Sequence, residues 1–247
     1  MKRFRRLLVA GLACALLLST KRLWASEAAQ QKPCELNRTI QVAMKYLLYL
    51  PKDYGQKPRW PLVLFLHGAG ERGDNLESVK KHGLPKLIAQ GQTFPFIVVS
   101  PQCARDQWWE TFGLTALLDE ISEKYKVDSD RIYVTGLSMG GYGTWALAAR
   151  TPNRFAAILP ICGGGNPGRT KQIAHLPVWV FHGAKDKVVP LEKSQEMVDA
   201  LKRHGGKVKF TIYPEADHDS WTLTYANPAI YEWLLQQQRM PQKQQGN

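Results

Sequence analysis

The chain has 247 residues, of which 44% are hydrophobic and 22% charged, and its 33 Lys and Arg against 21 Asp and Glu give a formal charge of +12. This balance is typical of a globular protein, and it excludes a disordered chain, a collagen-like fibre and a polytopic membrane protein. Four cysteines are too few for a small domain built on disulfides, and the length fits one α/β domain or at most two small ones.

The first 25 residues have the pattern of a secretory signal peptide. A basic cluster, MKRFRR, precedes an apolar run from Leu7 to Thr20, which is shorter than the roughly 20 apolar residues that span a bilayer. Leu23 and Ala25 fit the −3 and −1 positions of a cleavage site after Ala25. We therefore expect an exported protein, periplasmic or secreted, with no stable membrane association after cleavage. An uncleaved anchor is the alternative interpretation.

Charge and cysteine content restrict the partners. Residues 1–25 hold six of the 33 basic residues and no acidic one, so the remaining chain has a formal charge of +6. Its Lys and Arg are scattered, and we expect no nucleic-acid partner. The remaining cysteines are Cys34, Cys103 and Cys162, so at most one internal disulfide can form. The sequence does not choose a pair, nor does it exclude buried thiols, and the oligomeric state stays open.

After a lead-in at residues 26–38, short β-rich runs alternate with helical segments. The strand candidates are Ile40 to Leu50, Pro61 to Leu66, Phe96 to Ser100, Arg131 to Thr135, Ala156 to Ile161, Val178 to Phe181 and Val208 to Tyr213. The helix candidates are Leu76 to Ala89, Leu114 to Tyr125, Met139 to Ala149, Leu191 to His204 and Pro228 to Gln238.

This alternation predicts an α/β fold, an open, doubly wound and mostly parallel sheet with helices on both faces, over residues 39–238. Several strands, such as LVLFL and VWVF, are apolar throughout, as expected of strands buried on both faces. A polar tail at residues 239–247 follows. Ligands in such sheets bind at the carboxyl ends of strands, so functional residues are expected directly after each strand.

The segment RIYVTGLSMGGYGTW contains a G-x-S-x-G motif between a predicted strand and a predicted helix. In this context the motif forms a sharp turn that exposes the serine, Ser138. The turn leaves no room for side chains two residues away on either side, and Gly136 and Gly140 meet that requirement. Ser138 is therefore the candidate nucleophile. A glycine-rich turn with an idle serine is the alternative.

A serine hydroxyl needs a base, and the base needs an acid that orients it. His218 lies in the polar loop after the last predicted strand, and Asp186 follows the strand before it. The order Ser138, Asp186, His218 is the one expected for this type of site. Asp217 and Asp219 are the alternatives for the acid, although they flank His218 too closely to reach its ring easily. No cofactor is required, and no spacing of His or Cys predicts a metal.

Two backbone N–H groups are needed to stabilise the negative oxygen that develops during such a reaction. One is expected from Met139, directly after the candidate nucleophile. The other is expected from the small-residue loop HGAGERG, with Ala69 as our choice and Gly70 second.

Only residues 163–177 separate the predicted strand Ala156 to Ile161 from the next one, Val178 to Phe181. This segment is too short to form a lid domain over the site. We therefore expect a shallow open site with Trp108, Trp109 and Trp221 as candidate substrate-binding walls, and such a site suits an ester carried by an aryl group or a polysaccharide.

The motifs LHGAGERGDN, VVSPQC, GLSMGGYGTW, PICGGG, HGAKDKVVP and HDSW together resemble the α/β-hydrolase superfamily. The sequence is most similar to compact bacterial carboxylesterases of the dienelactone-hydrolase-like and prolyl-oligopeptidase-type groups, and it is also similar to feruloyl and acetylxylan esterases and polyhydroxybutyrate depolymerases. The resemblance runs from about Ile40 to Leu235. It implies a serine carboxylesterase, with Ser138, Asp186 and His218 as the triad and Ala69 and Met139 at the oxyanion positions.

Three other functions remain open at this point. A peptidase or an acyltransferase would use the same triad, and a binding module on the same fold would not use it at all. Ester, peptide anilide and acceptor-alcohol substrates separate the first two from an esterase.

Overall fold

The computed structural model describes Gln31 and residues 33–239. The proposed signal peptide and residues 240–247 of the polar tail lie outside the described residues. Residues 1–41 and 42–247 form separate units, and the described part of the first contains no helix or strand. In the part of the chain that is described, no helix is long and apolar enough to span a bilayer.

The second unit is built on one sheet of seven strands in the order β1-β3-β2-β4-β5-β6-β7. β1 pairs antiparallel with β3, and the other neighbours are parallel. The strands are β1 (Tyr46–Tyr49), β2 (Trp60–Leu66), β3 (Ile97–Pro101), β4 (Val127–Leu137), β5 (Ala157–Ile161), β6 (Val178–Gly183) and β7 (Val208–Tyr213).

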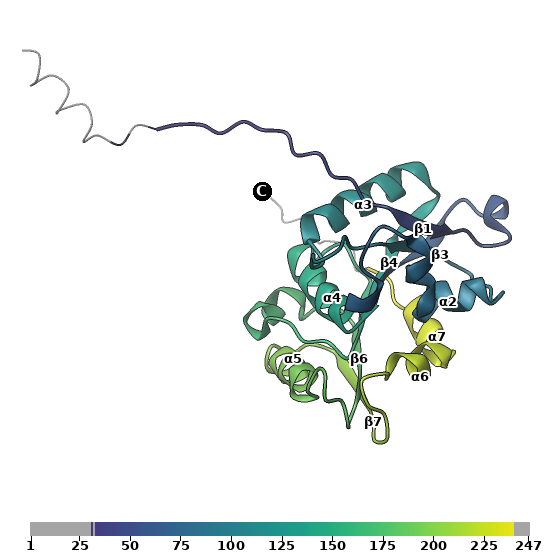
Figure 1. Ribbon diagram of the computed structural model, residues 1–247, viewed down its shortest axis with the longest axis vertical. Coiled ribbons are helices and arrows are strands. Elements are labelled where there is room, and N and C mark those ends of the chain that lie inside the picture. Colours follow the sequence, from purple (N-terminus) through teal and green to yellow (C-terminus); the bar gives the residue numbers. More distant parts are fainter. Residues whose placement is uncertain (1–30, 32, 240–247) are drawn as a thin grey trace, which may run out of the picture. The chain divides into compact units, whose positions relative to one another are not determined.

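Helices cover both faces of this sheet (Figure 1). The α-helices are α2 (Gly83–Ala89), α3 (Thr111–Lys124), α4 (Met139–Arg150), α5 (Glu192–Arg203), α6 (Trp221–Ala226) and α7 (Ala229–Leu235). Short 3-10 helices are η1 (Tyr54–Gln56), η2 (Ala69–Glu71), η3 (Leu76–Lys81) and η4 (Pro167–Ile173).

The hydrophobic core consists of two layers, one on each face of the sheet. Leu62, Leu64 and Leu66 of β2 pack toward α3, α4 and α5, while Val63 and Phe65 pack toward α2, α6 and α7. This is why the strand is apolar at every position. The predicted doubly wound α/β fold is confirmed.

Several predicted elements differ from the structure. The expected strand Ile40 to Leu50 is reduced to β1, a short edge strand. The expected helix Leu76 to Ala89 is broken into η3 and α2 at Gly83, whose φ is +62° and where a Cβ would lie 2.2 Å from the Phe65 ring. Helix α7 ends at Leu235, before the expected Gln238, and α6 was not predicted.

Candidate active site

The sharp turn between β4 and α4 presents Ser138 at the carboxyl end of the sheet. Ser138 has φ 52° and ψ −116°, a positive φ that is uncommon for a residue with a side chain. Its amide donates to the carbonyl oxygen of Ile161 on the neighbouring strand, at 3.0 Å. This bond ties the turn to β5, and the serine side chain makes no capping hydrogen bond to α4.

Glycines allow this turn to sit close to β2. A Cβ on Gly140 would lie 1.9 Å from the carbonyl oxygen of Leu66, and a Cβ on Gly136 would lie 2.4 Å from the carbonyl oxygen of Gly140. Gly141 approaches the end of β5 in the same way, since a Cβ there would lie 2.5 Å from the Ile161 oxygen. The motif is therefore a packing requirement at each of these glycines.

His218 links the other two side chains that the sequence singles out, Ser138 and Asp186. It lies in the loop between β7 and α6, and its Nε2 is 3.0 Å from Oγ of Ser138. Its Nδ1 is 2.7 Å from Oδ2 of Asp186, in the loop after β6. Residues 80 and 32 positions apart in the chain thus form one hydrogen-bonded series. The alternative acids Asp217 and Asp219 instead accept local bonds from the amides of Asp219 and Thr222.

Asp186 is held as an ionised acceptor. Its side chain is fully buried, and its Oδ1 accepts the amides of Val188 and Val189, each at 2.9 Å. Burial alone would raise the pKa of this carboxyl, but the bonds from His218 and the two amides outweigh it and leave the pKa of Asp186 below its ordinary value. An ionised carboxylate in this position fixes the Nδ1–H tautomer of His218.

The two backbone amides proposed for the oxyanion are first residues of helices. Met139 begins α4, and Ala69 begins the 3-10 helix η2 in the loop after β2. N–H groups in the first turn of a helix have no partner inside that helix, so they are available to a ligand. Arg72 holds this loop, because its Nε donates to the Ala69 carbonyl and its Nη1 to the Gln107 carbonyl.

The three tryptophans occupy different environments. Trp108 is 64% exposed and its ring contacts Tyr142 edge-on, one helical turn after Ser138. The Trp221 ring lies perpendicular to that of His218, with centroids 5.1 Å apart. Trp109 is only 7% exposed and donates its indole N–H to the His67 carbonyl. The position of the Trp109 ring in the hydrophobic core does not favour the expectation that it walls an open site.

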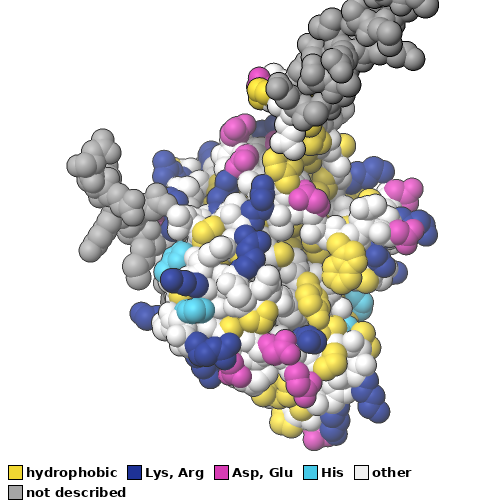
Figure 2. All heavy atoms as spheres, turned by 90° about the vertical axis from the view of Figure 1, so that its left-hand side faces the viewer, with side chains coloured by type: hydrophobic (Ala, Val, Ile, Leu, Met, Phe, Trp, Pro, Cys, Tyr) yellow, Lys and Arg dark blue, Asp and Glu magenta, His cyan; other side chains and the backbone are white. Residues whose placement is uncertain are grey.

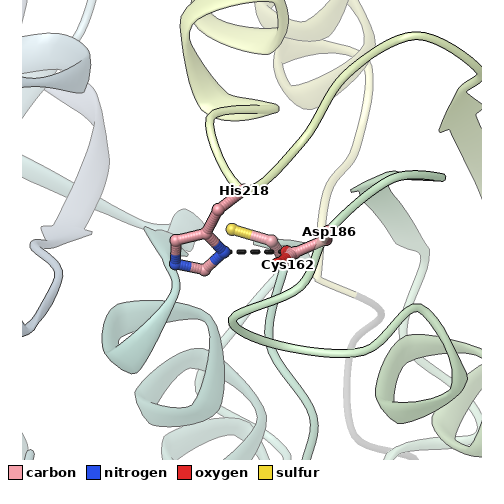
Figure 3. Close-up of side chains that lie close together, drawn as sticks. All are labelled: Cys162, Asp186 and His218. Atoms are coloured by element: carbon pink, nitrogen blue, oxygen red, sulfur yellow. Dashed lines mark hydrogen bonds and ion pairs between the residues drawn. The ribbon is translucent and has the colours of Figure 1, made fainter.

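Two further residues at this site were not anticipated by the sequence argument. His182, which the sequence argument does not single out, is buried beside Asp186, with Nε2 3.2 Å from Oδ2. Cys162 is buried at the end of β5, and its thiol lies close to His218 and Asp186 (Figure 3). Both lie at the carboxyl end of a strand, where side chains from different strands gather at one edge of the sheet. This position in the predicted strand pattern was the one sequence signal that could have found them.

Cys162, Asp186 and His218 bring one potential metal ligand each within 4.8 Å of one another. Burial raises the pKa of Cys162 to about 12, which disfavours the thiolate that binds metals. The nitrogen and oxygen that a metal would need are already bonded to each other. Cys162 and Cys103 are both buried thiols outside any disulfide.

Other surface features lie away from these residues. A hollow of about 740 Å³ lies at the amino-terminal ends of β5, β6 and β7, lined in part by Phe155, Pro177 and Trp233. None of the candidate site residues lines it. On the face shown in Figure 2, Lys and Arg are interspersed with acidic and apolar side chains.

Comparison with known proteins places this arrangement in a family. The chain is 26% identical over 227 residues to the probable feruloyl esterase C of Aspergillus niger, covering 84% of this chain and 82% of that protein. It is 26% identical to the bifunctional acetylxylan esterase/xylanase of Neocallimastix patriciarum, covering 75% of this chain but 27% of that protein. It is 35% identical to a thermostable esterase of known structure, with a TM-score of 0.69, covering 79% of this chain and 60% of the other.

The shared fold is that of α/β-hydrolase esterases. Residues 104–227, from the loop after β3 through α6, match the sequence profile of the Dienelactone hydrolase family. This range includes Ser138, Asp186 and His218. The chain therefore belongs to the dienelactone hydrolase family.

Proposed function

We propose that this chain is a serine carboxylic-ester hydrolase that works through an acyl-enzyme, with Ser138 as nucleophile, His218 as base and Asp186 as acid. One observation carries the proposal: His218 bridges the other two side chains at 3.0 and 2.7 Å. Family membership and the esterases among the relatives support the same reaction class.

The reaction begins when His218 Nε2 takes the hydroxyl proton of Ser138 while Oγ attacks the ester carbonyl. The carbonyl oxygen becomes an oxyanion that the N–H groups of Ala69 and Met139 stabilise. Collapse of this intermediate breaks the bond to the alcohol, which leaves with the proton from His218. Water then attacks the acyl-enzyme with His218 again as base, which releases the carboxylic acid and restores the serine.

We further propose that the substrate is an exposed ester on a polymer or an aryl group, such as a feruloyl or acetyl ester. The segment between β5 and β6 contains only the short helix η4, so it supplies no lid over Ser138. Trp108, beside Tyr142, and Trp221, beside His218, are proposed to contact the substrate. The relatives that act on feruloyl and acetylxylan esters support this class. The N-terminal sequence supports export to the periplasm or the medium.

A hydrolysis panel tests the proposal. It contains p-nitrophenyl esters from acetyl to decanoyl, methyl ferulate, acetylated xylan and a peptide p-nitroanilide, each with and without an added acceptor alcohol, and the Ser138→Ala variant is the control. We expect turnover of the short and aromatic esters and of acetylated xylan. Preferential cleavage of the anilide would make the protein a peptidase, and transfer to added alcohols in place of hydrolysis would make it an acyltransferase.

A further inference from the structure

Asp186 contacts a second histidine besides His218. His182 lies on β6, four residues before Asp186, and its Nε2 is 3.2 Å from the same Oδ2 atom that His218 Nδ1 approaches to 2.7 Å. The carbonyl oxygen of Val189 lies 2.8 Å from this Nε2. We propose that His182 is a positioning residue that holds the Asp186 carboxylate in the orientation that serves His218. This inference rests on the proposed function, because it requires Asp186 to act as the acid of the triad.

The surroundings of His182 fix its proton. The ring is completely buried, and burial lowers its pKa, so the ring is neutral and carries one N–H. Both neighbours of Nε2, the Val189 carbonyl and the Asp186 carboxylate, can only accept a hydrogen bond, which places the proton on Nε2. Nδ1 lies 2.7 Å from the hydroxyl of Ser194, whose single proton can be donated to this nitrogen or to the Gly163 carbonyl, 3.3 Å away. Ser194, itself fully buried on α5, accommodates this tautomer, in which the Nε2–H lies between the Val189 carbonyl and the Asp186 carboxylate.

The two oxygens of Asp186 are held by different parts of the fold. Oδ1 accepts amides of its own loop, from Val188 and Val189. Oδ2 is approached by His182 from the sheet and by His218 from the loop after β7. The loop amides bind only Oδ1, so the position of Oδ2 depends on its contacts with the two histidines. A neutral donor anchored in the sheet stabilises the carboxylate charge without competing for the proton that His218 must carry.

Two substitutions separate the donor from the bulk of the ring. His182→Leu removes the N–H donor and fills the same space with an apolar side chain of similar size. His182→Gln has an amide N–H that can reach Oδ2 of Asp186. With p-nitrophenyl acetate we expect His182→Leu to lower kcat about 10- to 100-fold, the equivalent of one hydrogen bond to a charged group. KM should change by less than about twofold, and His182→Gln should recover much of the loss.

The pH dependence of kcat/KM distinguishes the proposed role from a purely structural one, because a purely structural role of His182 would not shift it. Asp186 and His218 are the titratable groups that act on His182. Without the donor, the carboxylate charge acts more fully on the His218 imidazolium, so the acid limb of kcat/KM should move to higher pH in His182→Leu. Ser194→Ala should shift it in the same direction by less. Ser122→Ala is the matched control, because the Ser122 hydroxyl donates to the Leu118 carbonyl on α3, and this variant should leave the profile unchanged.

A double-mutant cycle decides between positioning and general support. The Asp186→Asn variant has no carboxylate to hold, so adding His182→Leu should reduce kcat by less than about twofold. An equal loss in both backgrounds, or an unchanged acid limb, would overturn the inference. If thermal unfolding shows that His182→Leu is not folded, Ser194→Ala and His182→Gln provide the same test. Ester turnover by the wild type and its loss in Asp186→Asn test the proposed function separately.

Discussion

Ser138 shows how one residue combines strain and chemistry. Its positive φ of 52° is a conformation that costs a residue with a Cβ about 1–3 kcal/mol. The sequence predicts this residue because the G-x-S-x-G spacing has a steric cause. The sequence does not indicate the contact of His182 with Asp186 or the burial of Trp109, because both depend on tertiary packing. A histidine before a glycine and a tryptophan in a polar loop look alike in sequence whether they face solvent or the core.

Replacing Ser138 tests both properties. Ser138→Ala should reduce ester turnover by about 10⁴-fold or more, because no nucleophile remains. Its free energy of unfolding should match the wild type, since the backbone strain persists. Ser138→Gly should be about 1 kcal/mol more stable than Ser138→Ala, because glycine adopts a positive φ freely. Turnover kept within tenfold in Ser138→Ala would refute the assignment, and urea unfolding measures the stability difference.

A second prediction at this scale concerns acid stability. His67 is completely buried, donates Nδ1–H to the Gly68 carbonyl and accepts the Cys103 amide at Nε2. Burial lowers its pKa from 6.5 to about 4. Between these two pH values the unfolded chain takes up a proton that the folded chain does not. Stability is therefore complete above pH 6.5 and falls toward pH 4, by on the order of 3 kcal/mol from this residue alone.

Unfolding in urea from pH 8 to pH 4 measures this effect. His67→Gln should be less stable at pH 8, because it loses buried contacts, but its stability should depend less on pH. An equally steep pH dependence in the wild type and in His67→Gln would contradict the assignment. His182, whose pKa burial also lowers, contributes in the same direction and accounts for acid sensitivity that remains.

At the scale of elements, the patterns predicted type and order better than boundaries. β7 matches its expected range, and α3, α4 and α5 differ from theirs by only a few residues. The misplaced elements have tertiary causes. Gly83 interrupts a helical pattern because Phe65 needs the space, and β1 is short because only four residues pair with β3. Such contacts join segments far apart in sequence, which periodicity does not report.

The contact between α4 and β2 gives a prediction with a matched control. Gly140→Ala places a Cβ 1.9 Å from the Leu66 carbonyl oxygen, a backbone atom that cannot move aside. We expect a loss of more than about 3 kcal/mol of stability, or no folded protein. Gly70→Ala meets nothing within 4 Å and should be tolerated. Thermal unfolding of both variants checks this, and a stable Gly140→Ala would show that the turn is less tightly packed than described.

The adjacent tryptophans give a second element-scale test. Trp109→Ala should destabilise the protein by about 3–5 kcal/mol, because the ring is buried in the hydrophobic core. Trp108→Ala should leave stability within about 0.5 kcal/mol and raise KM for bulky esters such as acetylated xylan. Phe112→Ala, which removes another exposed aromatic, is the control. Equal KM values for Trp108→Ala and the control would remove Trp108 from the substrate surface.

For the whole molecule, topology brings the chemistry together. Parallel strands β4, β6 and β7 end at one edge of the sheet, so residues from three loops that are far apart in the sequence meet there. The candidate triad was predictable because the G-x-S-x-G motif marks Ser138 and the predicted strand order places Asp186 and His218 at the same edge. The identity of the ester was not, because it depends on side chains such as Trp108 and Trp221 whose exposure packing decides.

The most direct test of the central claim is the site and stoichiometry of covalent labelling by a fluorophosphonate, read by intact mass and peptide mapping. We predict one label per chain, on Ser138, with parallel loss of p-nitrophenyl acetate turnover and no labelling of Ser138→Ala. Folded protein that hydrolyses the ester yet takes no label at Ser138 would contradict the account.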